Sequence, residues 1–346
     1  MRVRLLTLIA GMAIAVAAAS AQTAAPWTAP RTPWGHPDLQ GIWNAATLTP
    51  LERPETVAGK LSLTKEEADA IEHTERARVA QRAQPSDPNR AAPVAGGAVG
   101  GYNNFWIDRG TSAFVVDGQH RTSIIVDPAD GKIPPMMAEA RRRNTGARGT
   151  VVRPTSDAPE SAGVEGPGAF DDPELRPLGE RCLLGFGSTS GPPTLPNYFY
   201  NNYKQIVQTP DHVMILIEMV HDARIIRLNG QHPPPSIKKW MGDSIGHFEG
   251  DTLVVETTNF SNKTRFRGSS ENMKVIERFR RMNADTILYR FTIEDPSTWA
   301  TAWTGEYPWV STDEMMYEYA CHEGNYALGD ILRGERVLDR ERSDKK

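Results

Sequence analysis

The pattern of apolar and polar positions centres on Gly246–Phe260, the stretch around which the rest of the chain is organised. A Glu-Gly-Asp triplet inside this stretch is typical of a tight turn, because Gly adopts positive φ and Asp bonds nearby backbone. Thr252–Phe260 follows the turn and is rich in β-branched residues, which favour strands. Successive strand residues point to opposite faces, and both faces here carry apolar side chains. We therefore expect a strand that is covered on both sides, with Glu256 in its middle.

Further β-rich runs precede and follow this stretch, and short turns separate them. The turns carry Asp-Gly, Pro-Asp and Asn-Gly pairs, which are typical of hairpins. Strands joined by short turns pair in antiparallel fashion, and closure into a barrel hides their edges. The pattern predicts a mainly β fold, an antiparallel meander of about 8–10 strands closed into a lipocalin-like barrel. The runs are Thr111–Val116, Thr122–Asp127, Lys204–Thr209, His212–Val220, Ala223–Leu228, Lys274–Arg281, Thr286–Glu294, Gly305–Val310 and Met316–His322.

Residues 22–100 differ from this pattern, because they are rich in Pro, Thr and Ala. We interpret them as an extended arm that carries one surface helix. Thr64 and Glu67 form a capping-box pattern, and the polar run that follows has only a thin apolar stripe. Leu39–Asn44 has the composition of a first short strand. A second short helix is predicted at Met136–Asn144, so the fold has one or two peripheral helices.

The rest of the chain is predicted to be one domain with a tail. Residues 101–335 form the β-barrel domain, interrupted by a long loop at 146–181 that is rich in Pro and Gly. Residues 336–346 are a charged tail, which we expect to fray because nothing in its pattern predicts packing.

The first 21 residues have the three parts of an export signal. Arg2 and Arg4 supply positive charge, Leu5–Ala17 is an apolar run, and Ala19–Ala21 are small. The apolar run is too short for a membrane span, and no later stretch of the sequence is long and apolar enough for one. We therefore predict that residues 1–21 are removed and that the mature protein is periplasmic or secreted.

Net charge limits the kinds of partner that we expect, and the cysteine content predicts a disulfide. The formal net charge of −4 disfavours nucleic acid, whose binding needs a basic patch. The two cysteines, Cys182 and Cys321, are expected to form a disulfide in an oxidising compartment. Two separate buried thiols are the alternative. The sequence indicates no oligomeric state.

Two motifs carry a resemblance. Trp240–Ser244 (WMGDS) with 249–260 (EGDTLVVETTNF), and Tyr319–Tyr326 (YACHEGNY), resemble a family of exported bacterial proteins. That family has no established activity, so the resemblance implies no catalytic residues. The strand rhythm, with Gly41–Trp43 near its start, is similar to lipocalin-like and fatty-acid-binding barrels. Such barrels include carriers of apolar ligands and cofactor-free cyclases, isomerases and decarboxylases, and the fold alone does not choose among them.

Titratable residues inside otherwise apolar strands are the candidates for chemistry. We predict Glu218, His221, Asp222 and Glu256 as catalytic residues. A carboxylate in an apolar interior has a raised pKa unless it is paired, and a raised pKa suits acid–base catalysis near neutral pH. The alternative is that strand carboxylates, including Glu277, pair with strand arginines or point outward.

Substrate-binding residues are predicted around the same strands, chosen as aromatic, amide or charged side chains that give a ligand direction. No cofactor is predicted. No metal is predicted either, because no histidine pair has a recognised metal-ligand spacing such as His-Glu-x-x-His. The predicted substrate-binding residues are Tyr203, Arg224, Trp240, Asp243, Asn259, Trp303 and Tyr307.

Gly242-Asp243-Ser244 is similar to the nucleophile block of the Gly-Asp-Ser-Leu hydrolases. Those proteins are α/β and carry the block near their start, with an Asp-x-x-His near their end. Here the block lies mid-chain among strands and no such Asp-x-x-His follows. We therefore interpret it as a turn in which Asp243 and Ser244 bond backbone groups.

Three functions fit these patterns. The first is a cofactor-independent enzyme, of lyase, hydratase, isomerase or cyclase type, that acts on a small apolar or aromatic molecule in a barrel pocket. The second is a periplasmic carrier or sensor of an apolar ligand without catalysis. The third is an envelope-associated structural protein with a filled barrel.

Overall fold

We describe the protein from a computed structural model. The described residues are 27–85, 89, 91, 107–151, 170–185, 190–197, 200–264 and 266–344, with backbone only at 145–151. The predicted signal peptide at 1–21 lies outside them, as do residues 152–169 of the predicted 146–181 loop. Export and signal cleavage therefore stay predictions.

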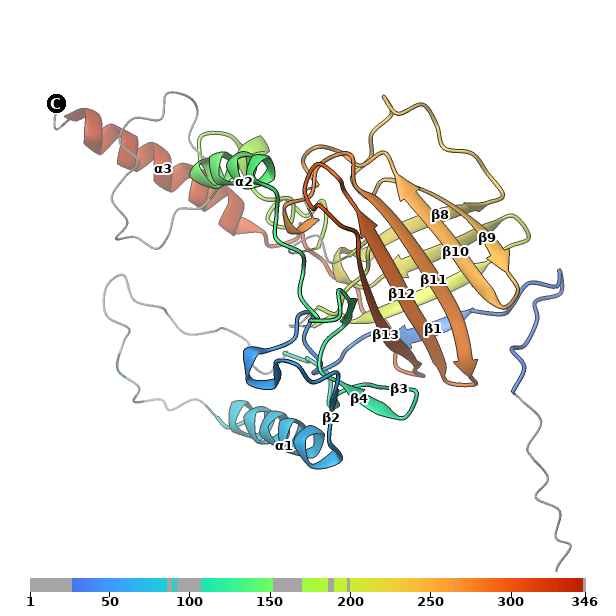
Figure 1. The fold of residues 1–346 in the computed structure, drawn as a ribbon. Coiled ribbons are helices and arrows are strands. Elements are labelled where there is room, and N and C mark those ends of the chain that lie inside the picture. Colours follow the sequence, from blue (N-terminus) through green and yellow to red (C-terminus); the bar gives the residue numbers. More distant parts are fainter. Residues whose placement is uncertain are drawn as a thin grey trace, which may run out of the picture.

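Within the described residues, nine strands close into a barrel (Figure 1). Closure occurs where β1 pairs with β13, so neither strand is left with an open edge. The short strand β5 (Ile125–Asp127) adds to β13 outside this ring. The mainly β barrel of 8–10 strands is thus confirmed. In ring order the strands are β1 (Gly41–Asn44), β6 (Tyr203–Gln208), β7 (His212–Ile217), β8 (Asp222–Leu228), β9 (Asp243–Glu249), β10 (Thr252–Thr258), β11 (Lys274–Asn283), β12 (Thr286–Glu294) and β13 (Trp303–Ser311).

One strand pair departs from the predicted antiparallel order. β8 and β9 are parallel, with Ile226 opposite Ser244. A parallel neighbour needs a crossover that returns the chain to the same end of the barrel. Residues 229–242 supply it, and the Pro233–Pro235 run within them prevents a tight hairpin. We call this segment the crossover.

Elements outside the barrel largely follow the sequence prediction. α1 (Lys65–Arg82) begins at Thr64 with both capping-box bonds present, which confirms the predicted helix. A hairpin forms around the predicted Asp117-Gly118 turn, but it joins β3 (Val115–Val116) to β4 (Gln119–Arg121), while the predicted second strand at Thr122–Asp127 contains β5, which pairs with β13. β2 (Ser62–Leu63) completes a small separate sheet beside α1. α2 (Ala138–Val151) begins near the predicted position and runs longer. Short 3-10 turns lie at Glu55–Val57, Pro173–Leu175, Met219–His221 and Phe266–Gly268.

The arm is part of the barrel and not only an appendage. Its residues 41–44 form β1, the strand that closes the ring, so the predicted boundary at residue 100 does not separate the arm from the barrel. The chain before β1 is bonded to the barrel through Gln208, whose side chain accepts from the Leu39 N–H at 2.6 Å and donates to the Pro37 carbonyl at 3.1 Å.

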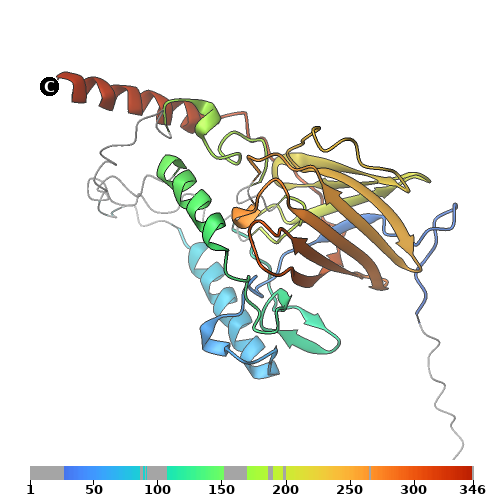
Figure 2. The ribbon, with the colours of Figure 1, turned by 45° about the horizontal axis from the view of Figure 1, so that its top comes forward.

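Two predictions about the C-terminal part are wrong. Met316–His322 is not a strand, because β1 already occupies the edge of β13 that it would need. Residues 336–344 of the predicted charged tail are helical and belong to α3 (Tyr326–Asp344), which extends away from the barrel (Figure 2). Ion pairs along the helix, such as Arg333 with Asp330 at 3.0 Å, support it where no side chain is buried.

The barrel interior is filled by aromatic and aliphatic side chains. Rings contact one another across neighbouring strands: Tyr289 lies 4.9 Å from both Phe279 and Trp309, measured between ring centroids. Each such residue contributes roughly 1.5–3 kcal/mol by burial alone. Residues 190–197 are also buried and reach the interior, because the Thr194 N–H donates to the Tyr289 hydroxyl and the Tyr307 hydroxyl donates to the Thr194 carbonyl.

Candidate functional site

A buried ion pair joins two strands across the barrel interior. Arg224 on β8 donates two hydrogen bonds to Glu277 on β11, at 2.6 and 3.1 Å, and both residues are fully buried. Tyr289 donates to the same carboxylate at 2.8 Å, and burial raises the pKa of its hydroxyl well above the usual value. The pairing of strand carboxylates with strand arginines is confirmed for Glu277. The terminal nitrogens of Arg224 are therefore occupied and not open to a substrate.

Trp303 and Tyr307, predicted to bind substrate, lie on the inward face of β13 with no exposed surface. Tyr307 uses its hydroxyl on Thr194, as described above. Trp303 packs edge-on against Phe291 at 5.9 Å and Trp299 at 5.8 Å. Both residues line the filled interior of the barrel.

Sequence reasoning missed the most unusual interior residue, Lys204 on β6. Its side chain is 0% exposed, and Nζ has no hydrogen-bond partner among the described residues. Burial lowers the pKa of Lys204 to about 7, and the charge of Glu218 acts in the opposite direction. The signal was present in the alternation of β6, where Lys204 shares a face with the apolar Ile206.

Glu218 anchors one end of the barrel. It is 4% exposed, and its two oxygens accept from the backbone N–H groups of Tyr203 at 3.2 Å and Tyr317 at 2.9 Å. These bonds tie residues 312–325, which we call the C-terminal segment, to strand β6. Tyr203, predicted to bind substrate, is half-buried beside this anchor, and burial raises the pKa of its hydroxyl, with Glu314 and Asp108 acting in the same direction.

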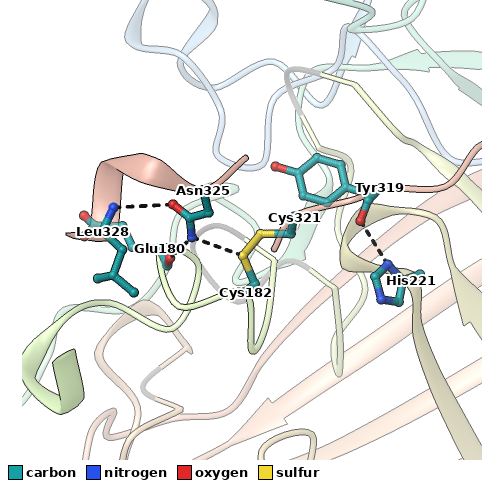
Figure 3. The surroundings of a disulfide bond; sticks show 7 residues. All are labelled: Glu180, Cys182, His221, Tyr319, Cys321, Asn325 and Leu328. Carbon is teal, nitrogen blue, oxygen red and sulfur yellow. Dashed lines mark hydrogen bonds between the residues drawn. A yellow bond between two sulfur atoms is a disulfide. The ribbon is translucent and has the colours of Figure 1, made fainter. Parts of the chain in front are cut away.

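The turn after Glu218 is strained. Val220 and His221 have φ values of 64° and 46°, a left-handed conformation that β-branched residues rarely adopt. Such conformations cost about 1–3 kcal/mol each and concentrate at functional sites. His221 Nδ1 lies 3.0 Å from the Tyr319 carbonyl oxygen (Figure 3). Because a carbonyl only accepts, Nδ1 donates the proton, and Nε2 is the basic nitrogen of this exposed side chain.

Asp222 follows directly and begins β8. It has the same strand parity as Arg224, so its side chain is directed inward at the end of the barrel. Its Oδ2 is buried and has no hydrogen-bond partner within the part of the chain that the structure describes. Burial raises the pKa of Asp222 to about 6, and the charge of His221 acts in the opposite direction. The structure therefore brings together three of the four predicted catalytic residues, Glu218, His221 and Asp222.

A disulfide holds the C-terminal segment beside this turn. Cys182 and Cys321 are bonded, with a Cα–Cα distance of 5.7 Å, which confirms the predicted bridge. Asn325 reinforces it, since its side-chain amide donates to the Glu180 carbonyl at 2.9 Å and lies 3.5 Å from Cys182 Sγ (Figure 3). Cys321 is two residues after Tyr319, whose carbonyl oxygen accepts from His221. The bridge therefore holds this carbonyl group, and with it the imidazole, in place.

Glu256 does not belong to this group, and its predicted interior position is wrong. Its side chain is 43% exposed on the outer face of β10, where His232 Nε2 lies 3.4 Å and Lys274 Nζ 3.8 Å from its oxygens. The 3.4 Å approach is not aligned as a hydrogen bond. The inward residues of β10 are instead Leu253, Val255 and Thr257. The crossover residue His232 lies against the outer face of β10 at Glu256.

Asp243 holds the crossover on the barrel. It is 1% exposed and accepts from Arg227 at 2.6 and 3.0 Å, from Lys239 at 2.7 Å, and from His232 Nδ1 at 3.0 Å. Burial alone would raise the pKa of Asp243, but the hydrogen bonds from Arg227, Lys239 and His232 outweigh it and hold the pKa well below its usual range.

Other predicted site residues belong to the same anchor. Asn259 donates to the Pro233 carbonyl at 3.1 Å, and the Trp240 carbonyl accepts from the Thr264 hydroxyl at 2.7 Å. Ser244 points into the barrel and bonds the Thr257 hydroxyl at 2.8 Å, which argues against a nucleophile. Residues of the WMGDS and EGDTLVVETTNF motifs therefore hold the crossover on the barrel. They are not part of the strained turn.

The structure shows a closed, disulfide-linked β-barrel with Glu218, His221 and Asp222 at one end. In the described ranges, no three His, Cys, Asp or Glu side chains gather as a metal site would require. No described helix is long and apolar enough to cross a membrane. Comparison with protein-family models, with curated proteins and with solved structures finds no match.

Proposed function

We propose that the protein is an exported, cofactor-independent enzyme that uses acid–base chemistry on a small apolar molecule. The observation that carries the proposal is Asp222, a carboxyl with a buried, unpartnered oxygen, next to His221 on a strained turn. A pKa of about 6 lets Asp222 both accept and donate a proton near neutral pH. The reaction class is a lyase, hydratase, isomerase or cyclase, since each needs a proton removed and another delivered.

The geometry suggests separate roles for the two groups. Asp222 is directed into the barrel end, so its carboxylate removes a proton from a substrate carbon next to a carbonyl. The electron pair of that C–H bond then stays on the substrate as an enolate. His221 is exposed and exchanges protons with water through Nε2. Glu218 is a positioning residue, because its oxygens are occupied by backbone N–H groups.

Deuterium incorporation tests this role with a panel of model compounds that carry acidic C–H bonds. Ketones and β,γ-unsaturated ketones are incubated with the mature protein in D₂O and followed by proton NMR. We expect exchange at one carbon of at least one member, and a loss of about 10²- to 10⁴-fold in Asp222→Asn. The rate should rise with pH around an apparent pKa of about 6, because the carboxylate is the active form. His221→Ala should be slowed less.

Asp211 and His212 supply a matched control. They are likewise an aspartate and a histidine adjacent in sequence, but at the other end of β7 and in an ion pair of 3.0 Å. Asp211→Asn and His212→Ala should leave exchange unchanged. Wild-type exchange in Asp222→Asn would refute the assignment.

A carrier that binds an apolar ligand without catalysis is the second candidate. The buried, unpartnered amine of Lys204 favours it, because such a group suits a polar ligand head. The absence of exchange for the whole panel would favour this candidate over the enzyme.

A further inference from the structure

Residues 313–318 contact the end of the barrel at Glu218. They follow β13, belong to the C-terminal segment and have no regular secondary structure. The Tyr317 N–H donates to Glu218 Oε1 at 2.9 Å, and Glu218 is only 4% exposed. In the part of the chain that the structure describes, no other hydrogen bond joins residues 313–318 to the barrel. We call this stretch the end loop.

Both ends of the end loop are fixed. Before it, the Thr312 N–H donates to the Ile42 carbonyl of β1 at 3.1 Å. After it, Tyr319 packs against the core, its carbonyl accepts from His221 at 3.0 Å, and the disulfide follows at Cys321 (Figure 3). A loop fixed in this way can move between its ends while the elements that it connects stay in place.

Little burial holds the end loop against the barrel. Its side chains are exposed, apart from the half-buried Met316. The exposed fractions of Met315 and Tyr317 are 66% and 64%, which is high for large apolar side chains. A segment that buries few apolar groups opens at a lower free energy than the core does. The hydrogen bond between Tyr317 and Glu218 is therefore the main contact that opening has to break.

We propose that the end loop is a lid, which opens between its fixed ends when the Tyr317–Glu218 bond breaks and admits the substrate to Asp222. Asp222 begins β8 at the same end of the barrel, and its Oδ2 is buried. A substrate can reach this carboxyl at the barrel end without entering the filled interior. The inference deepens the proposed function, on which it rests, by naming the entrance to the site.

Glu218 has the bonds that such a lid needs. Its Oε2 accepts from the Tyr203 N–H of β6 at 3.2 Å, and its Oε1 accepts from Tyr317. When the lid opens, the first bond keeps the carboxylate in position and water replaces Tyr317 at the second oxygen. Met315 and Tyr317 also place apolar surface on the lid, which contact with an apolar substrate would bury.

Hydrogen exchange of the mature protein tests the opening. In the wild type, we expect a protection factor at the Tyr317 amide at least tenfold below that at Thr312, because only the first opens with the lid. Glu218→Gln keeps the side-chain shape but offers a weaker acceptor, so protection at Tyr317 should fall about tenfold further. Protection at Thr312 should not change. Glu318→Gln is the matched control on an exposed side chain, and should leave both amides as they are.

A chemical probe tests whether the lid controls access to Asp222. A water-soluble carbodiimide with glycine ethyl ester labels carboxyl groups that reagents can reach, and mass spectrometry locates the label. We expect the labelling rate of Asp222 to rise in Glu218→Gln by about the factor found for Tyr317 exchange, and to stay unchanged in Glu318→Gln. Neither measurement needs turnover. If no model compound incorporated deuterium while both results held, the enzyme proposal would fall and the lid would stand.

Three outcomes overturn the inference. The first is equal protection at Tyr317 and Thr312 in the wild type, which would mean that residues 313–318 open only with the barrel. The second is unchanged Tyr317 exchange in Glu218→Gln. The third is an Asp222 labelling rate that does not follow Tyr317 exchange, since the entrance would then lie elsewhere. If Glu218→Gln does not fold, the wild-type comparison of the two amides still decides whether the lid opens.

Discussion

Lys204 lies in surroundings that disfavour the charge its side chain normally carries. Lysine is almost never fully buried unless it is paired, yet this side chain is 0% exposed. Its pKa falls from 10.5 in the unfolded chain to about 7 in the barrel. Between those values the folded protein binds fewer protons than the unfolded chain. The residue therefore costs stability below pH 7, and the cost is relieved as pH rises toward 10.5.

Lys204→Met should stabilise the unliganded protein. A shift of 3.5 pH units corresponds to about 5 kcal/mol at most, so we expect a gain of roughly 2–4 kcal/mol in the free energy of unfolding at pH 6. The gain should shrink to about half by pH 9. Urea denaturation at both pH values measures it. A loss of stability in Lys204→Met would mean that the amine has a structural partner, and would argue against a functional role.

At the scale of elements, the crossover depends on one carboxylate. A crossover without a helix has no periodic hydrogen bonds of its own, so its position relies on side chains. Asp243 joins the crossover residues His232 and Lys239 to Arg227 of β8. Its own burial would be costly without these partners. The parallel pair β8–β9 is therefore stabilised through a polar cluster as much as through backbone bonds.

Asp243→Ala should loosen the crossover. The cations left behind are partly exposed and can regain water, so we expect a loss of about 2–3 kcal/mol, below the range for fully buried pairs. Glu249→Ala is the control, because Glu249 lies on the same strand, is 49% exposed, and should cost under about 1 kcal/mol. Hydrogen exchange should quicken at the amides of Lys239 and Ser261, which bond across the crossover. Equal losses in the two variants would contradict the anchoring role.

At the scale of elements, the sequence predicted where the strands lie but not how all of them pair. Strand positions and the closed barrel were predictable, because alternation and turn residues are local signals. The parallel pair was not, since strand composition does not state which neighbour a strand takes. Glu256 was misplaced for a related reason: with apolar residues on both faces of β10, the pattern did not identify the inner one. Lys204 could have been identified from the alternation of β6, because it shares a face with Ile206, but only acidic residues and a histidine were chosen as catalytic candidates.

At the scale of the whole molecule, the disulfide connects distant parts of the chain to the proposed site. Cys182 and Cys321 are 139 residues apart in sequence. The bridge keeps the C-terminal segment against the barrel end, where Tyr317 bonds Glu218 and Tyr319 bonds His221. The disulfide therefore holds the segment that contacts both Glu218 and His221. Removing the disulfide should lower the free energy of unfolding and loosen the position of the His221 imidazole.

Replacement of both cysteines by serine tests that boundary. A bridge that closes a loop of this length restricts the unfolded chain, and its loss should lower the free energy of unfolding by about 2–5 kcal/mol. The amides of Tyr317 and of residue 321 should exchange faster, because both lie on the segment that the bridge fixes. The Asn325→Ala variant keeps the bridge and removes only its side-chain bonds, so it should lose much less. If the double variant kept wild-type protection at Tyr317, the segment would be held by its own packing, and the disulfide would not be what fixes His221.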